Sequence, residues 1–158
     1  ATSALGKGTC FTFYLPASAT VAGPTDDISE GLLQGTGRIL VMDDEEEIRE
    51  VLGKMLQHLG FEVDFACDGS QAVALYCRAM EDKTPYVATI LDLTIPGGMG
   101  GKETLRRIQQ LHPDAIVIVS SGYSNDPVMA QATQFGFSGF IPKPYNLVDL
   151  SKVLSRLL

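Results

Sequence analysis

The chain has 158 residues, 45% of them hydrophobic and 20% charged, a balance typical of one soluble globular domain with a tail. Its formal net charge is -7, and its 12 basic residues are scattered among 19 acidic ones, which argues against a nucleic-acid partner. The three cysteines lack metal-ligand spacing and no apolar run approaches the roughly 18 residues of a membrane span, so we expect a cytoplasmic protein with free thiols.

The N-terminal residues predict a single β-strand followed by a linker. Apolar and polar residues alternate from Cys10, and Pro16 ends the run because proline cannot continue a strand ladder. A lone strand does not fold by itself. Residues 17–36 have the composition of a linker, since small and polar residues, proline, glycine and a few acids replace the periodic apolar residues.

From residue 37 onward, strand-like and helix-like patterns alternate, which predicts βαβ units and a doubly wound α/β domain. The predicted strands are residues 39–42, 61–66, 89–91, 115–119 and 139–142. The predicted helices are residues 45–59, 70–80, 102–111, 127–135 and 147–158. Gly60 and Gly136 are expected to end the first and fourth helices, while Asp126 and Asn146 are expected to cap the starts of the fourth and fifth.

Four of the predicted strands end on charged or hydroxyl side chains. These are Asp43 and Asp44, Asp92, Ser120 and Ser121, and Lys143. Ligands of open α/β sheets bind outside the carboxyl ends of the strands, so these side chains are expected to converge there. Three carboxylates, a hydroxyl and an amine in one crevice predict a site for a divalent cation and a phosphoryl group.

The residues and their order resemble a response-regulator receiver domain, the phosphoacceptor module of bacterial two-component signalling, over residues 37–158. The resemblance needs several motifs at once: the acidic pair, the Asp-Leu-Thr-Ile-Pro-Gly-Gly-Met-Gly-Gly loop from Asp92, the Ser-Gly at Ser121 and the Lys-Pro at Lys143. The spacings of 29 positions from Asp92 to Ser121 and 22 from Ser121 to Lys143 also agree with the family. The resemblance implies a flavodoxin-like, five-stranded parallel sheet of order 2-1-3-4-5 with helices on both faces.

The resemblance also implies a role for each charged side chain of the site. Asp92 would be the phosphoacceptor and would bind Mg²⁺ together with Asp43, Asp44 and the backbone carbonyl of Thr94. Asp44 is expected to be the more direct ligand, with Asp43 acting partly through water. Lys143 would contact the phosphoryl oxygens.

The family's conformational switch is expected at Ser121 and Phe140. Ser121 is favoured over Ser120 because Gly122 follows it and because of its spacing to the lysine. Phe140 matches the aromatic switch position, although an apolar residue in a short strand is more often part of a core. Tyr123, two positions beyond Ser121, is expected to line the approach to the phosphoryl group and to tune its hydrolysis.

We therefore predict a module that takes a phosphoryl group from a phosphohistidine onto Asp92 and changes conformation. The expected partner is a histidine kinase or a histidine phosphotransfer domain, with no nucleic acid, no membrane contact and at most a weak homodimer. Two alternatives are a small Mg²⁺-dependent aspartyl-phosphate phosphatase and a degenerate receiver that serves only as an interaction module. Thr94 stands where the phosphatase class needs a second Asp, and the complete acidic set argues against a degenerate receiver.

Residues 6–16 resemble the last glycine-rich box and closing strand of a histidine-kinase ATP-binding domain. We therefore expect a hybrid sensor histidine kinase in which residues 1–16 are a remnant of that domain, 17–36 a linker and 37–158 the receiver. The chain has no upstream nucleotide-binding motifs, so we expect no kinase activity of its own beyond self-catalysed phosphorylation and dephosphorylation of Asp92, and its status as an enzyme stays open. The parent protein could be anchored in a membrane.

Overall fold

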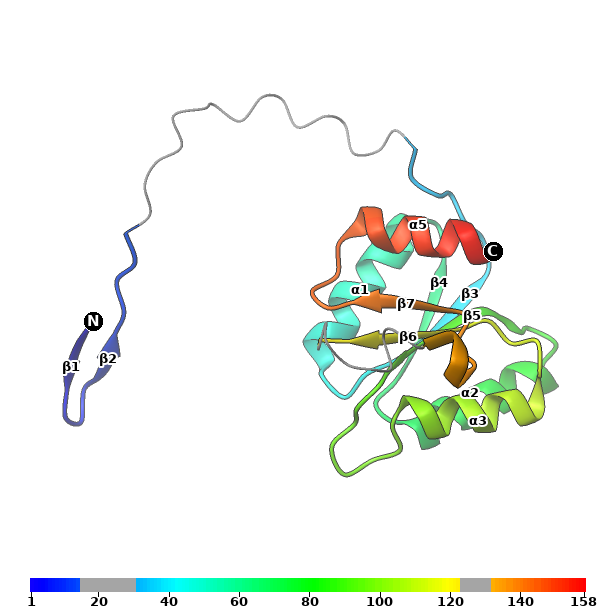
Figure 1. The fold of residues 1–158 in the computed structure, drawn as a ribbon, viewed down its shortest axis with the longest axis horizontal. Coiled ribbons are helices and arrows are strands. Elements are labelled where there is room, and N and C mark those ends of the chain that lie inside the picture. The colour runs from blue at the N-terminus through cyan, green and yellow to red at the C-terminus, as the bar shows by residue number, and fades with distance from the viewer. Residues whose placement is uncertain (15–30, 123–131) are drawn as a thin grey trace.

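A parallel β-sheet forms the centre of the fold (Figure 1). The computed structural model describes residues 1–14, 31–122 and 132–158. The strands of the sheet are β3 (Arg38–Met42), β4 (Glu62–Ala66), β5 (Tyr86–Asp92), β6 (Val117–Ser121) and β7 (Gly139–Pro142). They are parallel and lie in the order β4-β3-β5-β6-β7, which confirms the predicted order 2-1-3-4-5.

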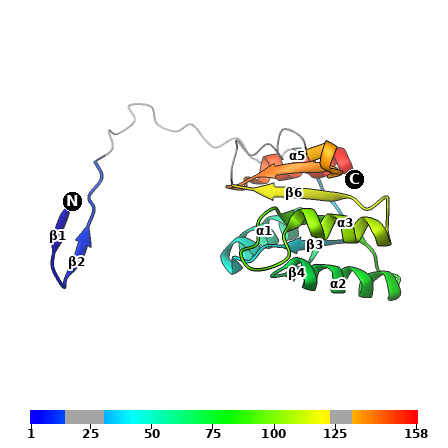
Figure 2. The same ribbon diagram turned by 60° about the horizontal axis from the view of Figure 1, so that its bottom comes forward.

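Helices cover both faces of the sheet, as predicted. The helices are α1 (Glu46–His58), α2 (Gly69–Glu81), α3 (Gly101–Leu111) and α5 (Leu147–Leu157), with a 3-10 helix η1 (Ala132–Phe135). Helices α1 and α5 pack on one face, and α2 and α3 lie together on the other (Figures 1 and 2). Within the described ranges, no helix is long and apolar enough to cross a membrane.

The pleat of β3 explains how one sheet supports two cores. Ile39 and Val41 are buried with the helices α1 and α5, whereas Leu40 and Met42 are buried with α2 and α3. Successive side chains of a strand point to opposite faces, so a strand covered on both sides is a continuous apolar run. Acidic side chains, those of Asp43 and Asp44, follow directly where this apolar run ends at the carboxyl end of the strand.

The predicted ends of the helices are correct where the structure describes them. Gly60 and Gly136 have φ angles of +94° and +93°, a left-handed conformation that favours glycine at the end of a helix. The Asn146 side chain accepts a hydrogen bond of 2.8 Å from the backbone N–H of Asp149 and so caps α5. The final turn before Gly136 is a 3-10 helix rather than the predicted α-helix, and the predicted start at Asp126 lies outside the described residues.

The prediction of one N-terminal strand from Cys10 is wrong. The segment forms an antiparallel hairpin of β1 (Thr2–Ala4) and β2 (Gly8–Cys10), and residues 11–14 have no regular structure. Gly6 and Gly8 have φ angles of +74° and +84°, which lets the chain turn back. The predicted strand would have lacked a partner for its backbone hydrogen bonds, whereas the hairpin pairs the residues on either side of the turn.

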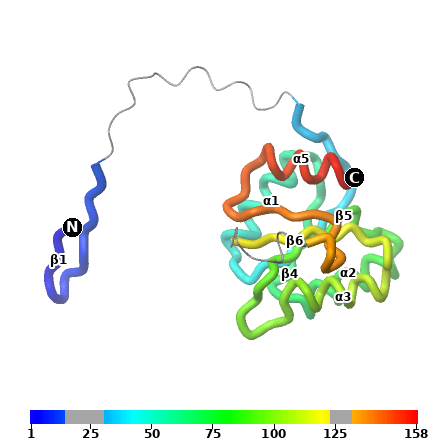
Figure 3. Tube along the Cα trace, in the orientation of Figure 1, coloured from blue at the N-terminus to red at the C-terminus, as the bar shows by residue number. Residues whose placement is uncertain are grey.

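Residues 32–37 pack against the domain, although composition assigned residues 32–36 to a linker. Leu32 and Leu33 lie against the core under α1 and α5, and the backbone N–H of Leu33 donates a 2.8 Å hydrogen bond to the Ser151 hydroxyl. The backbone N–H of Gly35 donates to the carbonyl of Leu59 at 2.7 Å. This short strap passes the C-terminal end of α5 and leads into β3 (Figure 3).

Candidate functional site

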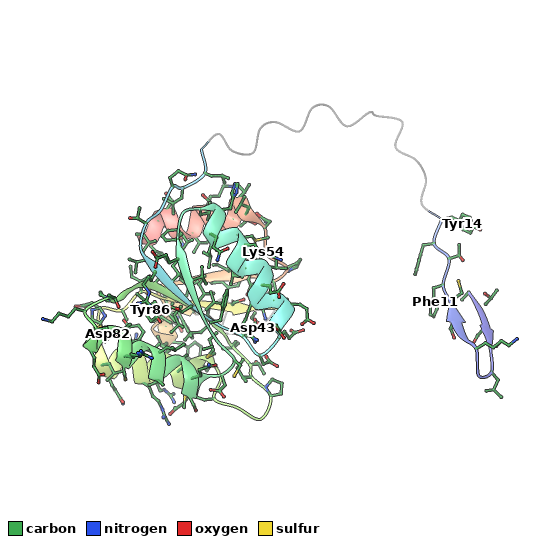
Figure 4. All side chains as sticks on the ribbon, turned by 180° about the vertical axis from the view of Figure 1, so that it is seen from behind. Phe11, Tyr14, Asp43, Lys54, Asp82 and Tyr86 are labelled. Carbon is green, nitrogen blue, oxygen red and sulfur yellow. The ribbon has the colours of Figure 1, made fainter. Side chains whose placement is uncertain are left out.

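The three predicted carboxylates meet at the carboxyl edge of the sheet. Asp43 and Asp44 follow β3, and Asp92 is the last residue of the adjacent strand β5. One carboxylate oxygen from each residue lies within 4.8 Å of the other two. Asp43 is buried, Asp44 is exposed, and the Asp92 side chain is 12% exposed. Figure 4 shows Asp43 at the end of the sheet opposite Tyr86, where β5 begins.

Lys143 brings a cation into this acidic group from the end of β7. Its Nζ lies 2.6 Å from Oδ2 of Asp43 and 3.3 Å from Oδ2 of Asp92. Its backbone N–H donates a 3.0 Å hydrogen bond to the carbonyl of Ser121, and its peptide bond to Pro144 is cis. The ammonium therefore contacts two of the three clustered carboxylates, and a bound cation would relieve the remaining negative charge.

The pKa values of the two central groups, Asp92 and Lys143, are both raised, but for different reasons. Burial raises the pKa of Asp92 above its ordinary value, and Asp43 adds to this effect, while Lys143 and the backbone N–H of Leu93 work against it. Burial alone would lower the pKa of Lys143, but the hydrogen bond to Asp43 and the surrounding negative charge outweigh it and raise that pKa. Lys143 is therefore a stable cation at neutral pH.

An open cleft of about 330 Å³ lies beside these charges. It is lined by Asp44, Glu45, Asp92, Thr94, Pro96, Ser121, Gly122 and Lys143. The cleft thus joins Thr94 and Ser121 to the charged residues, as the sequence predicted. It gives a small anion access to the Asp92 carboxylate with a hydroxyl and an ammonium nearby.

The two neighbouring serines of β6 lie on opposite faces of the sheet. Ser121 lines the cleft, whereas Ser120 is fully buried and its Oγ lies 2.6 Å from Oη of Tyr145. The other predicted switch residue, Phe140, is partly buried and packs against the core on the α2 and α3 side. Tyr123 lies outside the described residues.

Helix α3 begins directly behind Asp92, and two glycines permit this close approach. The backbone N–H of Gly101 donates a 3.1 Å hydrogen bond to the carbonyl of Leu93. A Cβ on Gly101 would lie 2.7 Å from the carbonyl oxygen of Asp92, and one on Gly100 would lie 2.7 Å from that of Leu93. Close packing of backbone against backbone therefore explains why Gly100 and Gly101 are glycines.

Sequence reasoning missed Arg49. Its Nη1 donates hydrogen bonds to the backbone carbonyls of Asp43, at 2.6 Å, and Asp44, at 3.1 Å. Arg49 therefore fixes the backbone of the acidic loop through its carbonyls rather than through its carboxylates. Its sequence signal is a cation near the start of a helix, where the helix dipole disfavours positive charge.

Comparison with known proteins identifies the family that shares this fold. The family model of the response regulator receiver domain matches residues 39–155. The chain belongs to this family. Receivers are modules of two-component signalling, so the predicted class of protein is confirmed.

Two relatives are sensor kinases. The sensor kinase CckA of Brucella abortus is 28% identical over 165 aligned positions, which cover 99% of this chain and 17% of CckA. The sensor histidine kinase AtsR of Burkholderia thailandensis is 32% identical over 164 positions, which cover 98% of this chain and 26% of AtsR. The chain thus spans about a sixth to a quarter of these relatives, and the matches agree with a receiver of the hybrid-kinase kind.

A solved structure has the same fold. It is the complex of CheX and CheY with BeF3 and Mg²⁺ from Borrelia burgdorferi, which matches with a TM-score of 0.69 and 25% identity. The match covers 76% of this chain and 87% of that chain. The predicted flavodoxin-like architecture is thereby confirmed.

Proposed function

We propose that this receiver accepts a phosphoryl group on Asp92 from a phosphohistidine, with Mg²⁺ bound beside it. The observation that carries the proposal is the convergence of three carboxylates and one ammonium on an open cleft, with Lys143 3.3 Å from the Asp92 carboxylate. A carboxylate is a weak nucleophile toward an anionic donor, so such a reaction needs neighbouring positive charge.

Asp92 forms the new bond in the proposed reaction. One of its carboxylate oxygens attacks phosphorus while the bond from phosphorus to the imidazole nitrogen breaks, and the departing imidazole takes up a proton. Lys143 then neutralises part of the charge on the phosphoryl oxygens, and the hydroxyl of Ser121 donates a hydrogen bond to one of them. The movement of Ser121, together with Phe140, is the proposed switch.

The residues present fit Mg²⁺. Carboxylates and carbonyls are the hard oxygen ligands that this ion prefers, and the exposed position of Asp44 leaves room for retained waters. Asp43, Asp44, Asp92 and the backbone carbonyl of Thr94 would hold the ion. When bound, it would neutralise charge between the nucleophile and the phosphoryl group. The similar CheY of Borrelia burgdorferi was solved in complex with Mg²⁺ and BeF3, which supports this assignment.

The proposed partner is a histidine kinase or a histidine phosphotransfer domain. The similarity to sensor kinases extends over nearly the whole chain, which supports a parent hybrid histidine kinase. We propose that residues 1–16 belong to its ATP-binding domain, that 17–36 link the two domains and that 37–158 form the receiver.

Labelling with acetyl phosphate and Mg²⁺ tests the phosphoacceptor. We expect one base-labile phosphoryl group per chain, none on Asp92→Asn, and normal labelling of the control Asp114→Asn, whose carboxylate is exposed away from the cleft. Undiminished labelling of Asp92→Asn would disprove the assignment. Repeated turnover of a small phosphate ester would favour the phosphatase alternative, and a wild-type chain without label would favour the degenerate receiver.

Thermal melts test the metal site separately. A ligand that binds only the native state stabilises it by RT ln(1 + [L]/Kd), which is about 1.4 kcal/mol at ten times Kd. Mg²⁺ should therefore raise Tm relative to a non-coordinating salt at the same ionic strength. Equal Tm values in the two salts would count against a metal site.

A further inference from the structure

A hydrogen-bonded pair of hydroxyls, Ser120 and Tyr145, lies behind the cleft. Ser120 is fully buried, and its Oγ lies 2.6 Å from Oη of Tyr145. Tyr145 comes two residues after Lys143, in the connection between β7 and α5, and its ring packs against the core formed with α1 and α5. The pair therefore joins the end of β6 to the loop that carries the lysine of the site.

The hydrogen bond joins two neutral groups. Burial raises the pKa of Tyr145 to about 12, so its phenol keeps its proton at neutral pH. In the described part of the chain, each of the two hydroxyls has the other as its hydrogen-bond partner. Removing the Tyr145 hydroxyl leaves the buried Ser120 hydroxyl without a partner, and removing the Ser120 hydroxyl leaves the partly buried phenol without one, so the bond is well suited to hold the two segments together.

The backbone around Ser120 extends this connection to both sides of the site. The carbonyl of Ser120 accepts a 3.0 Å hydrogen bond from the N–H of Leu93, the residue after Asp92. The next carbonyl, that of Ser121, accepts from the N–H of Lys143 at 3.0 Å. The end of β6 thus lies between the proposed nucleophile and the lysine, and the Tyr145 hydroxyl ties the lysine loop to it from the opposite face.

We propose that Ser120 and Tyr145 are positioning residues for phosphoryl transfer. Their hydrogen bond fixes the loop that carries Lys143 against the strand that carries Ser121. They act through those two residues and do not line the cleft themselves. The inference rests on the proposed function, because Lys143 and Ser121 matter only if a phosphoryl group is bound at Asp92.

A double-mutant cycle tests the proposal, with the rate of labelling by acetyl phosphate and Mg²⁺ as the readout. Tyr145→Phe keeps the ring and its packing, and Ser120→Ala removes the other hydroxyl. Each should slow labelling roughly fivefold, an effect of the size expected for one hydrogen bond. The double variant should be no slower than the slower single variant, because both changes remove the same interaction.

Two measurements separate positioning from a general loss of stability. The Kd of Mg²⁺ should change less than about twofold, since the proposed ligands lie on other loops. Tyr86→Phe, a matched deletion of a buried phenol at the far end of the sheet, should label at the wild-type rate (Figure 4). All rates are compared at a temperature well below the Tm of every variant.

Four results would overturn the inference. Labelling rates of the folded single variants within twofold of wild type would show that the pair only stabilises the fold. Additive slowing in the double variant, or equal slowing in Tyr86→Phe, would show that the effect does not come from the bond. A wild-type chain that takes no phosphoryl group would overturn the proposed function, and this inference with it.

Discussion

Asp43 occupies a different environment from the other two carboxylates of the site. It is 1% exposed, and both of its oxygens have partners: Oδ1 accepts from the N–H of Glu45 at 3.0 Å and Oδ2 pairs with Lys143. Asp44, by contrast, is exposed and lines the cleft. These surroundings support the expectation that Asp44 contacts a metal ion more directly than Asp43 does.

Arg49 should contribute to stability far more than an ordinary surface arginine. Arg49→Ala should lower the free energy of unfolding by about 1–3 kcal/mol, because it leaves two loop carbonyls without charge-assisted hydrogen bonds. Arg78→Ala is the control, since Arg78 is 79% exposed and makes only a surface ion pair with Asp82, which predicts a loss of about 0.5 kcal/mol or less. Urea unfolding measures both, and equal losses would contradict the role of Arg49.

At the scale of elements, the start of α3 is set by its contact with the end of β5. Thr104, buried in the first turn of α3, donates a 2.9 Å hydrogen bond to the carbonyl of Gly100. The hydrogen bond from the N–H of Gly101 to the carbonyl of Leu93 then holds this first turn against the end of β5. A side chain added at Gly101 would push against the backbone of Asp92. Backbone cannot rotate out of the way as a side chain can.

Two helical glycines provide a matched test of this contact. In Gly101→Ala the new Cβ meets the Asp92 carbonyl, so we expect a loss of about 1–3 kcal/mol and slower labelling of Asp92. In Gly53→Ala the Cβ meets the ring of Phe65 at 2.5 Å, but that ring is 38% exposed and can turn outward. The better helix propensity of alanine, about 1 kcal/mol, should offset that cost. Urea unfolding and labelling rates compare the two variants. A larger loss of unfolding free energy in Gly53→Ala than in Gly101→Ala would refute the role given to the contact between α3 and β5.

For the whole molecule, the strap at residues 32–37 should mark where the stable domain begins. Deleting residues 1–30 should leave the free energy of unfolding unchanged, because residues 1–14 are exposed and the following ones have linker composition. Deleting residues 1–36 should cost about 2–4 kcal/mol, since it removes the packed Leu32 and Leu33 and the hydrogen bond to Ser151. Urea unfolding of both truncated chains decides, and equal stabilities would mean that the strap contributes nothing.

Buried tyrosines should make the protein unstable in alkali. Burial raises the pKa of Tyr86 and of Tyr145 from 10.0 to about 12. Below pH 10 both groups are protonated in the folded and unfolded states, but between about pH 10 and 12 the unfolded state loses these protons first, so stability falls as pH rises. Urea unfolding between about pH 10 and 12 should show that the free energy of unfolding falls as pH rises, with a shallower dependence on pH for Tyr86→Phe. Parallel slopes for the two proteins would contradict the assignment.

Sequence patterns and the family resemblance together were enough to predict the architecture and which residues gather at the candidate site. Runs of apolar residues predict strands covered on both faces, and parallel strands align their carboxyl ends, so Asp43, Asp44, Asp92 and Lys143 had to meet at one edge. These signals are local or follow from the strand order. The apolar runs and their charged ends are readable because each depends on neighbours within a few residues along the chain, whereas the strand order was implied by the resemblance.

The long-range contacts that hold these elements together are visible only in the folded structure. The bond of Arg49 to two carbonyls, the Ser120 and Tyr145 pair, and the strap bond from Leu33 to Ser151 leave little trace in sequence periodicity. The last of these joins residues 118 positions apart. Side-chain hydrogen bonds of this kind depend on how the loops and elements come together in space, which no local pattern of residues specifies.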